Sequence, residues 1–224
     1  MKQSIFTKVL SYITQQHMET IHSDYNEVLH VFLKNGRYQL CTANAIYSYG
    51  DKYDNFRRSF TQMDLAKMDI DTVLLLGFGL GSIPYMLEKT FQKRYSYTGI
   101  EIDESIIYLA SKYVLDELNS EIELIQADAY SYIYQTNMRY DLICIDIFVD
   151  DKIPEVFLDV DFLEAVTENL TELGVLMFNH LAYTKADKVA AETYYNDIFK
   201  TVFPDGKCLD VKGNLMMVNR VGWV

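Results

Sequence analysis

Short apolar runs alternate with segments of helical spacing along most of the chain after residue 70. Apolar strands separated by helices are typical of a parallel sheet that helices cover on both faces. The pattern predicts an α/β fold with a mostly parallel, seven-stranded sheet, whose last two strands form an antiparallel edge. The expected strands are residues 72–77, 96–102, 121–126, 140–147, 174–180, 207–211 and 214–221, and the expected helices are residues 82–91, 104–118, 129–135, 160–171 and 185–202.

The first fifty residues follow a different pattern. Apolar and polar residues alternate over 26–33, Asn35-Gly36 is a preferred two-residue hairpin turn, and residues 37–41 continue as the return strand. Helical spacing then extends over 53–68. We therefore expect a small N-terminal β-hairpin module over 1–50 and a larger α/β domain over 51–224.

Composition limits the kinds of function that fit this fold. The 224 residues are 50% hydrophobic, enough to bury one substantial core. No apolar run is long enough to span a membrane, and residues 1–16 lack the apolar centre of a signal peptide, so we expect a cytoplasmic protein with no membrane partner. The net charge of −12 opposes binding to nucleic-acid phosphates and is compatible with a small-molecule or cationic substrate.

The cysteines indicate neither a disulfide framework nor a metal site. Cys41, Cys144 and Cys208 are odd in number and form no C-x-x-C pair. We expect three reduced thiols and no bound metal.

A glycine-rich turn directly follows the first strand of the larger domain. Gly77 lets the chain leave the strand tightly, Gly79 allows a ligand to approach the backbone, and Gly81 brings the next helix close to the sheet. The G-x-G-x-G spacing is one residue shorter than the dinucleotide pattern, and no lysine follows as a phosphate-binding loop requires. The motif therefore favours a nucleoside site and argues against an ATP or GTP site.

The following strand ends in a carboxylate about twenty residues after the glycines. Glu101 would accept hydrogen bonds from both ribose hydroxyls, and its charge would repel a 2′-phosphate. We expect Glu101 and its neighbour Ile102 to line the nucleoside pocket. The alternative is a tight turn followed by a solvated acid at the end of a strand.

Two further acids follow later strands, so they should lie at the same edge of the sheet. Asp128, with Ala129, could meet the exocyclic amine of an adenine, or it could cap the following helix, and one residue could do both. Asp146 ends a strongly apolar strand, where a carboxylate can orient a nucleophile and accept its proton. The alternative role for Asp146 is a structural cap of the next turn.

With these motifs in this order, the chain resembles spermidine synthases and their relatives within the class I S-adenosylmethionine-dependent methyltransferase superfamily. The residues that carry the resemblance are Gly77-Phe-Gly79-Leu-Gly81, Glu101-Ile-Asp103-Glu104, Asp128-Ala129, Tyr140-Asp-Leu-Ile-Cys-Ile-Asp146, the run from Asp146 to Phe157, Asp161-Phe162 and Gly174-Val-Leu. The resemblance spans nearly the whole chain and implies a class I methyltransferase-like fold.

The resemblance also implies roles for individual residues. Gly77, Gly79 and Gly81 would line the methionine part of S-adenosylmethionine or of its decarboxylated form, Glu101 would hold the ribose, and Asp128 with Ala129 would contact the adenine. Asp146 matches the acid that activates the attacking amine in aminopropyl transfer. By analogy with relatives that carry an N-terminal β module, we expect a homodimer.

The chain departs from the spermidine synthase pattern near the amine site. Those enzymes have a second acid three residues after the first, where this chain has Val149, followed by Asp150 and Asp151. The family's N-terminal tyrosine signature falls near Tyr47 and around Phe56-Arg57-Arg58, and two arginines facing the pocket would repel a polyamine.

These departures lead us to expect methyl transfer to a small molecule as the main hypothesis. The alternative is aminopropyl transfer to putrescine or another amine, with Asp146 as base and Asp150 or Asp151 as a substitute anchor. A second alternative is a non-catalytic relative that binds the adenosyl group, in which Tyr47, Tyr49 or Phe148 would block Asp146.

The segment from Phe148 to Pro154 matches the place of a loop that closes over the active site and excludes water, and the alternative is a fixed surface turn. His180 follows the strand over 174–180 and could act as a second proton acceptor at the ligand side of the sheet. The alternative for His180 is a histidine at the end of a strand that bonds to backbone.

Overall fold

Two separate sheets build the molecule, which a computed structural model describes over residues 4–43 and 45–220. The N-terminal sheet is antiparallel, with the strand order β1-β2-β3-β4. The larger sheet has seven strands in the order β10-β11-β9-β8-β5-β6-β7. The strands are β1 (Gln16–Ile21), β2 (Leu29–Lys34), β3 (Arg37–Cys41), β4 (Ile46–Ser48), β5 (Thr72–Leu76), β6 (Ser96–Glu101), β7 (Glu121–Gln126), β8 (Tyr140–Ile145), β9 (Leu170–Leu181), β10 (Lys207–Asp210) and β11 (Asn214–Val218).

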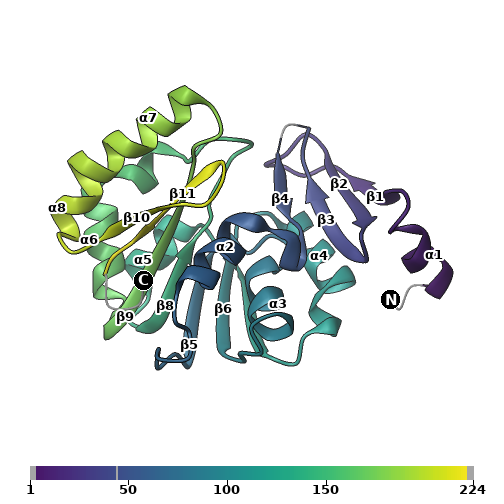
Figure 1. The fold of residues 1–224 in the computed structure, drawn as a ribbon, viewed down its shortest axis with the longest axis horizontal. Helices are drawn as coiled ribbons and strands as arrows, with labels where there is room; N and C mark the ends of the chain where they lie inside the picture. The colour runs from purple at the N-terminus through teal and green to yellow at the C-terminus, as the bar shows by residue number, and fades with distance from the viewer. Residues whose placement is uncertain (1–3, 44, 221–224) are drawn as a thin grey trace.

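Helices cover both faces of the larger sheet, as Figure 1 shows. The five strands from β9 to β7 are parallel, and β11 and β10 add an antiparallel edge. The helices are α1 (Ile5–Leu10), α2 (Asp54–Gln62), α3 (Ser82–Lys89), α4 (Glu104–Tyr113), α5 (Ala129–Gln135), α6 (Val160–Glu168), α7 (Lys185–Tyr194) and α8 (Lys200–Val202). This architecture confirms the α/β fold with its mostly parallel, seven-stranded sheet.

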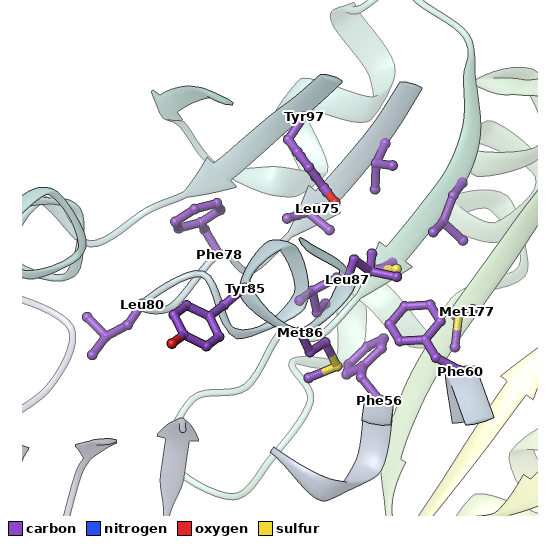
Figure 2. Packing of buried hydrophobic residues seen from close by; sticks show 14 of the residues in the cluster. Phe56, Phe60, Leu75, Phe78, Leu80, Tyr85, Met86, Leu87, Tyr97 and Met177 are labelled. Atoms are coloured by element: carbon purple, nitrogen blue, oxygen red, sulfur yellow. The ribbon is translucent and has the colours of Figure 1, made fainter. Parts of the chain in front are cut away.

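The two faces of the sheet belong to two apolar clusters because successive strand side chains point to opposite sides. On β5, Leu75 belongs to the cluster under α2, α3 and α4, whereas Leu74 and Leu76 belong to the cluster under α5, α6 and α7. In Figure 2, Phe56 and Phe60 of α2 reach toward Met86 and Met177 in the first cluster. Both phenylalanines are almost wholly buried, so α2 is fixed against the sheet by its apolar side.

Contacts with α4 hold the N-terminal sheet against the larger domain. Lys112 Nζ lies 2.8 Å from Glu19 Oε2, and the Tyr113 hydroxyl donates a 2.7 Å hydrogen bond to the same carboxylate. The Tyr113 ring also lies against Tyr38, with 4.9 Å between ring centroids. These contacts place β4 beside the carboxyl ends of the parallel strands, where ligands of such sheets bind.

Several boundaries differ from those that the sequence pattern predicts. The helix expected over 53–68 ends at Gln62, because the following apolar residues Met63, Leu65 and Met68 enter the core as an irregular segment. The helix expected over 185–202 contains a π-helical segment at Tyr195–Phe199. The last expected strand ends at Val218, and residue 221, its expected end, lies outside the described residues.

The pattern also missed elements of the first fifty residues. Neither α1 nor β1 was expected, because α1 is only six residues long with no buried residue, and β1 lacks a regular apolar alternation. The hairpin itself is confirmed, since Asn35 and Gly36 both have positive φ between β2 and β3. Over residues 4–43 and 45–220, no helix is long and apolar enough to cross a membrane.

The chain leaves β5 in a tight turn at Gly77, and we predict that a side chain at this position destabilises the fold. Gly77 has φ of +85°, and a Cβ atom there would overlap the backbone oxygen of Asp146. We expect Gly77→Ala to lower the free energy of unfolding by more than about 3 kcal/mol, because left-handed strain and a backbone clash add together. Urea unfolding followed by circular dichroism measures this change.

Gly213→Ala is the matched control. Gly213 has φ of +88°, but a Cβ atom there would meet only Tyr183 at an ordinary 3.5 Å. Strain alone should cost roughly 1 to 2 kcal/mol. Equal losses in the two variants would show that the approach of Asp146 to Gly77 contributes nothing.

Candidate active site

A cleft of about 950 Å³ opens at the carboxyl ends of the parallel strands, between the larger sheet and the N-terminal sheet. Its volume lies at the upper end of the range for small-molecule sites. The predicted site residues that line it are Tyr47, Gly77, Gly79, Glu101, Ile102, Asp128, Ala129, Asp146, Phe148, Asp150 and Asp151.

The glycine loop forms one wall of this cleft and is fixed by the N-terminal sheet. Gly79 has φ of +56°, and its backbone faces the cleft. The Ser48 hydroxyl of β4 accepts a 3.1 Å hydrogen bond from the Leu80 N–H and shares a 2.6 Å bond with the Ser82 hydroxyl. Gly81 is not among the cleft residues; its left-handed backbone precedes the first residue of α3, and a Cβ atom there would crowd the Phe78 ring at 3.0 Å.

Glu101 is a buried carboxylate at the end of β6. It accepts hydrogen bonds from the Gly79 N–H at 3.1 Å and from the Asp103 N–H at 3.2 Å. Burial raises the pKa of Glu101 to about 7, although these backbone donors oppose the shift. A buried carboxylate with few donors gains from two more hydroxyl donors, which is what a ribose offers.

Asp128 caps α5. Its Oδ1 accepts hydrogen bonds from the Ser131 N–H at 2.8 Å and the Ser131 hydroxyl at 2.7 Å, which is the helix-capping alternative. Asp128 and Ala129 also line the cleft, so capping and contact with a ligand are compatible at this position.

Asp146 lies at the floor of the cleft and is held from two sides. Its Oδ1 accepts a 2.8 Å hydrogen bond from the Asn179 side chain on β9, and its carboxylate also accepts one from the Tyr53 hydroxyl. Burial raises the pKa of Asp146 to about 6, while both hydrogen bonds act to lower it. Burial and the negative Asp146 together hold the pKa of Tyr53 well above its usual value, so Tyr53 remains a proton donor in this pair.

The loop after β8 is tied to the N-terminal sheet. The Tyr47 hydroxyl accepts a 2.7 Å hydrogen bond from the Asp150 N–H and donates a 3.0 Å bond to Asn26 Oδ1. Asn26 in turn donates to Asp103 Oδ2 at 3.0 Å, and Thr42 donates to Asp150 Oδ1 at 3.1 Å. The loop therefore lies over the cleft, and Asp146 still lines the cleft beneath it, so Tyr47, Tyr49 and Phe148 do not block that carboxylate.

His180 is not brought to this cleft. Along β9, Asn179 and Leu181 face the cleft, so His180 points to the opposite face of the sheet. Its ring lies 4.7 Å from the Tyr194 ring, its Nε2 has no hydrogen-bond partner among the described residues, and burial lowers the pKa of His180 to about 3. His180 lies near the end of β9, where a second proton acceptor was expected. Because side chains alternate between the two faces along a strand, its ring points away from the cleft.

The two arginines also lie elsewhere than expected. Arg57 and Arg58 each contact Asp54 on their own helix, and neither lines the cleft. The segment that does face the cleft comes just before them and comprises Tyr53, Asp54 and Asn55. The expected repulsion between these arginines and an amine is therefore absent, because α2 directs them away from the pocket.

The polar residues that hold Asp146 were not predicted: Tyr53 and Asn179 contact its carboxylate, and Asn214 contacts Asn179. Asn179 directly precedes His180, and Asn214 begins the last strand that the pattern predicts. Only the pairing of β9 with β11 brings the two asparagines together. Among the described residues, no group of three or more His, Cys, Asp or Glu side chains could hold a metal ion.

Two curated relatives align with this chain, whereas no family model matches it. A probable polyamine aminopropyl transferase of Bifidobacterium longum (strain NCC 2705) is 29% identical over 139 residues, which are 62% of this chain and 30% of that protein. A polyamine aminopropyltransferase of Vibrio vulnificus (strain CMCP6) is 25% identical over 181 residues, 77% of this chain and 58% of that protein. The chain thus spans less than two thirds of the length of either relative.

Solved structures share the fold at low identity. Spermidine synthase from Thermotoga maritima has a TM-score of 0.67 and 16% identity, covering 91% of this chain and 72% of that chain. A spermidine synthase in complex with the transition-state analogue AdoDATO gives a TM-score of 0.67 as well. Human methyltransferase-like protein 13 in complex with SAH has a TM-score of 0.55 and 23% identity, covering 69% of this chain and 73% of that chain.

The fold is therefore that of the class I S-adenosylmethionine-dependent methyltransferases. Within this class, the chain has spermidine synthase-like homologues, as its motifs predicted.

The raised pKa of Glu101 predicts how stability depends on pH. Between the ordinary value of 4.5 and the folded-state pKa of about 7, the folded protein binds a proton that the unfolded chain has released. The free energy of unfolding therefore falls as the pH rises through this window. From about pH 5.5 to about pH 8, we expect Glu101 to account for a loss of roughly 1 to 2 kcal/mol, which Glu101→Gln should remove.

Urea unfolding of the ligand-free protein at both pH values measures this effect. Glu88→Gln is the control, because the donors around Glu88 lower its pKa to about 2 despite burial, so its contribution is the same at both pH values. If Glu101→Gln keeps the full pH dependence of the natural protein, a charge buried at Glu101 is not its source.

Proposed function

We propose that this chain transfers an aminopropyl group from decarboxylated S-adenosylmethionine to a small amine. Its two curated relatives carry the name of this activity, and they favour it over methyl transfer, which was the main expectation from the sequence. Relatives of the transferase class also support an enzymatic role over a purely binding one.

The observation that carries the proposal is the charge of the cleft. Eight carboxylate residues line it, namely Asp54, Glu101, Asp103, Asp128, Asp146, Asp150, Asp151 and Asp187, against two lysines, Lys52 and Lys212. A donor with a sulfonium and a free amine is a cation throughout, and so is an amine acceptor before it loses a proton. A low-dielectric cleft lined by carboxylates concentrates such cations and offers little to a ligand carboxylate.

The residues of the cleft fit an adenosyl group. Gly77 and Gly79 leave room beside the backbone, and Glu101 is a buried acceptor suited to two hydroxyls. Ile102 and Ala129 add apolar surface for a flat ring, next to the polar Asp128. In this assignment Gly81 shapes the start of α3 without touching the ligand.

The donor supplies a sulfonium whose carbon–sulfur bond breaks and leaves its electron pair on sulfur. The chain's own contribution is to position the acceptor and to take its proton. Asp146 accepts the proton that the amine loses as its nitrogen forms the new bond to carbon, and Tyr53 with Asn179 fixes the carboxylate. Tyr47 holds the loop of Phe148, Asp150 and Asp151 over the cleft, which limits access of water.

Methyl transfer remains the second candidate because of one observation. Val149 stands where spermidine synthases have a second acid, and the neighbouring Asp150 accepts a hydrogen bond from Thr42. In the aminopropyl assignment, Asp151 is the anchor for the second cationic group of the acceptor, because it lines the cleft on the same loop.

Organisation and location belong to the same proposal. We propose that 1–50 acts as a module that completes the site of 51–224, supported by the contacts of Tyr47 and Ser48 with the cleft. Exposed apolar residues on α1, such as Ile5 at 84% and Phe6 at 76% exposure, support a homodimer. Three free cysteines support a reducing, cytoplasmic setting.

Calorimetric titration with four ligands tests the choice of donor. We expect decarboxylated S-adenosylmethionine and methylthioadenosine to bind more tightly than S-adenosylmethionine and S-adenosylhomocysteine, by about tenfold or more, because the acidic cleft disfavours the extra carboxylate. The opposite preference would establish methyl transfer as the better assignment. If none of the four ligands binds, the cleft of this chain does not take an adenosyl ligand.

Asp146→Asn tests the base. We expect donor affinity to change little while turnover with a panel of di- and polyamines falls by about a hundredfold or more, the usual contribution of a positioned base. Asp116→Asn, at an exposed position outside the cleft, controls for the loss of a charge. Equal losses of donor affinity and turnover would make Asp146 a structural residue.

A further inference from the structure

A chain of side-chain amides leads from β11 to Asp146. Asn214 Nδ2 donates a 3.0 Å hydrogen bond to Asn179 Oδ1, and Asn179 Nδ2 donates a 2.8 Å hydrogen bond to Asp146 Oδ1. The three residues come from β11, β9 and the end of β8, which are neighbours in the sheet. Their side chains meet because the antiparallel pairing sets Asn214 opposite Leu181, two residues from Asn179 on the same face.

The direction of these bonds fixes the orientation of Asn179. A side-chain amide has an oxygen that accepts and a nitrogen that donates, and exchanging the two ends reverses every bond that it makes. Asn214 donates to the oxygen of the Asn179 amide, and the nitrogen of that amide faces Asp146. Asn179 is only 1% exposed, so water cannot replace a lost partner without cost.

We infer that Asn214 is a positioning residue, which keeps the Asn179 amide turned so that Asp146 receives a donor and stays an oriented, ionised acceptor. Without Asn214, the Asn179 amide is free to turn its oxygen toward Asp146, an arrangement that favours the protonated carboxyl. Since the role assigned to Asp146 comes from the proposed function, the catalytic consequence of this inference rests on that proposal. The hydrogen-bond relay itself does not.

Other groups that face Asp146 are unchanged by substitution at 214. Tyr53 donates to the carboxylate from the segment before α2, and the Cys144 thiol lies on β8 itself, with its pKa raised by burial and by Asp146. Asp54, Glu101, Asp150 and Asp151 line the same cleft from other elements. Asn214→Leu therefore alters the relay without adding or removing a charge.

Carbon-13 NMR of the side-chain carboxyl groups tests the relay in the ligand-free protein. The resonance of Asp146 is assigned by its absence in Asp146→Asn, and its titration midpoint is compared between the natural protein and Asn214→Leu. We expect the midpoint to rise in Asn214→Leu and to stay in place in Asn196→Leu, which changes an exposed asparagine of the π-helical segment whose side-chain amide donates to the Glu192 carbonyl. An unchanged midpoint in Asn214→Leu overturns the inference.

A double-mutant cycle separates a relay from an independent effect. Asn179→Leu removes the donor to Asp146, so the midpoint should rise in that variant, and adding Asn214→Leu to it should change nothing further. A full additional shift in the double variant would show that Asn214 acts by another route. Asn214→Ser, which removes the amide with less change in packing, repeats the comparison if Asn214→Leu does not fold.

Kinetics then connect the relay with turnover. We expect kcat with an amine acceptor to fall roughly 2- to 10-fold near neutral pH in Asn214→Leu. The acidic limb of its pH–rate profile should move to higher pH, and the KM of the donor should stay unchanged. A raised NMR midpoint without any transfer activity in the natural protein would reject the proposed function and keep the relay. Transfer activity in the natural protein together with an unchanged NMR midpoint in Asn214→Leu would keep the proposed function and reject the relay.

Discussion

The reversal of strand order at β5 is the constraint on which the rest of this structure depends. β5 pairs with β6 on one side and with β8 on the other. The chain continues from β5 and from β8 into helices that lie on opposite faces of the sheet. The opening between them cannot be filled by backbone, and it is where ligands bind in open α/β sheets. Gly77 stands at this point, and the carboxylates of Glu101 and Asp146 end the two neighbouring strands. The same topology buries both acids, which is why the pKa of each is raised.

Much of the sheet and one half of the site could be predicted from the sequence because both depend on local signals. Apolar strands followed by glycine or acid mark the ends of β5, β6 and β8, and parallel strands bring those ends together. The other half depends on parity and pairing across the sheet, which single residues do not reveal. His180 and Asn179 are neighbours in sequence, yet one faces a hydrophobic layer and the other faces Asp146. The repulsion expected if Arg57 and Arg58 faced the pocket is absent, because the side of α2 that carries them does not line the cleft.

The N-terminal sheet is part of the site through β4 and through the loop between β1 and β2. Ser48 fixes the loop that carries Gly79, while Tyr47, one residue earlier, fixes the loop that covers the cleft. Asn26 connects this second contact to Asp103, whose Oδ1 caps α4 just after Glu101. The cleft wall that carries Gly79 and the loop that lies over Asp146 are thus held by the same small sheet.

The bond between Tyr47 and Asp150 also bears on how this family of loops can vary. Tyr47 receives a backbone N–H, so this contact survives any side chain at 150 that tolerates its φ of +56°, whereas the bond from Thr42 needs an acceptor there. Glycine, asparagine and aspartate tolerate that conformation best. The hydroxyl at 47, in contrast, must sit at the end of a ring long enough to reach both Asn26 and the loop. The contact therefore tolerates several residues at 150 but requires the tyrosine hydroxyl at 47.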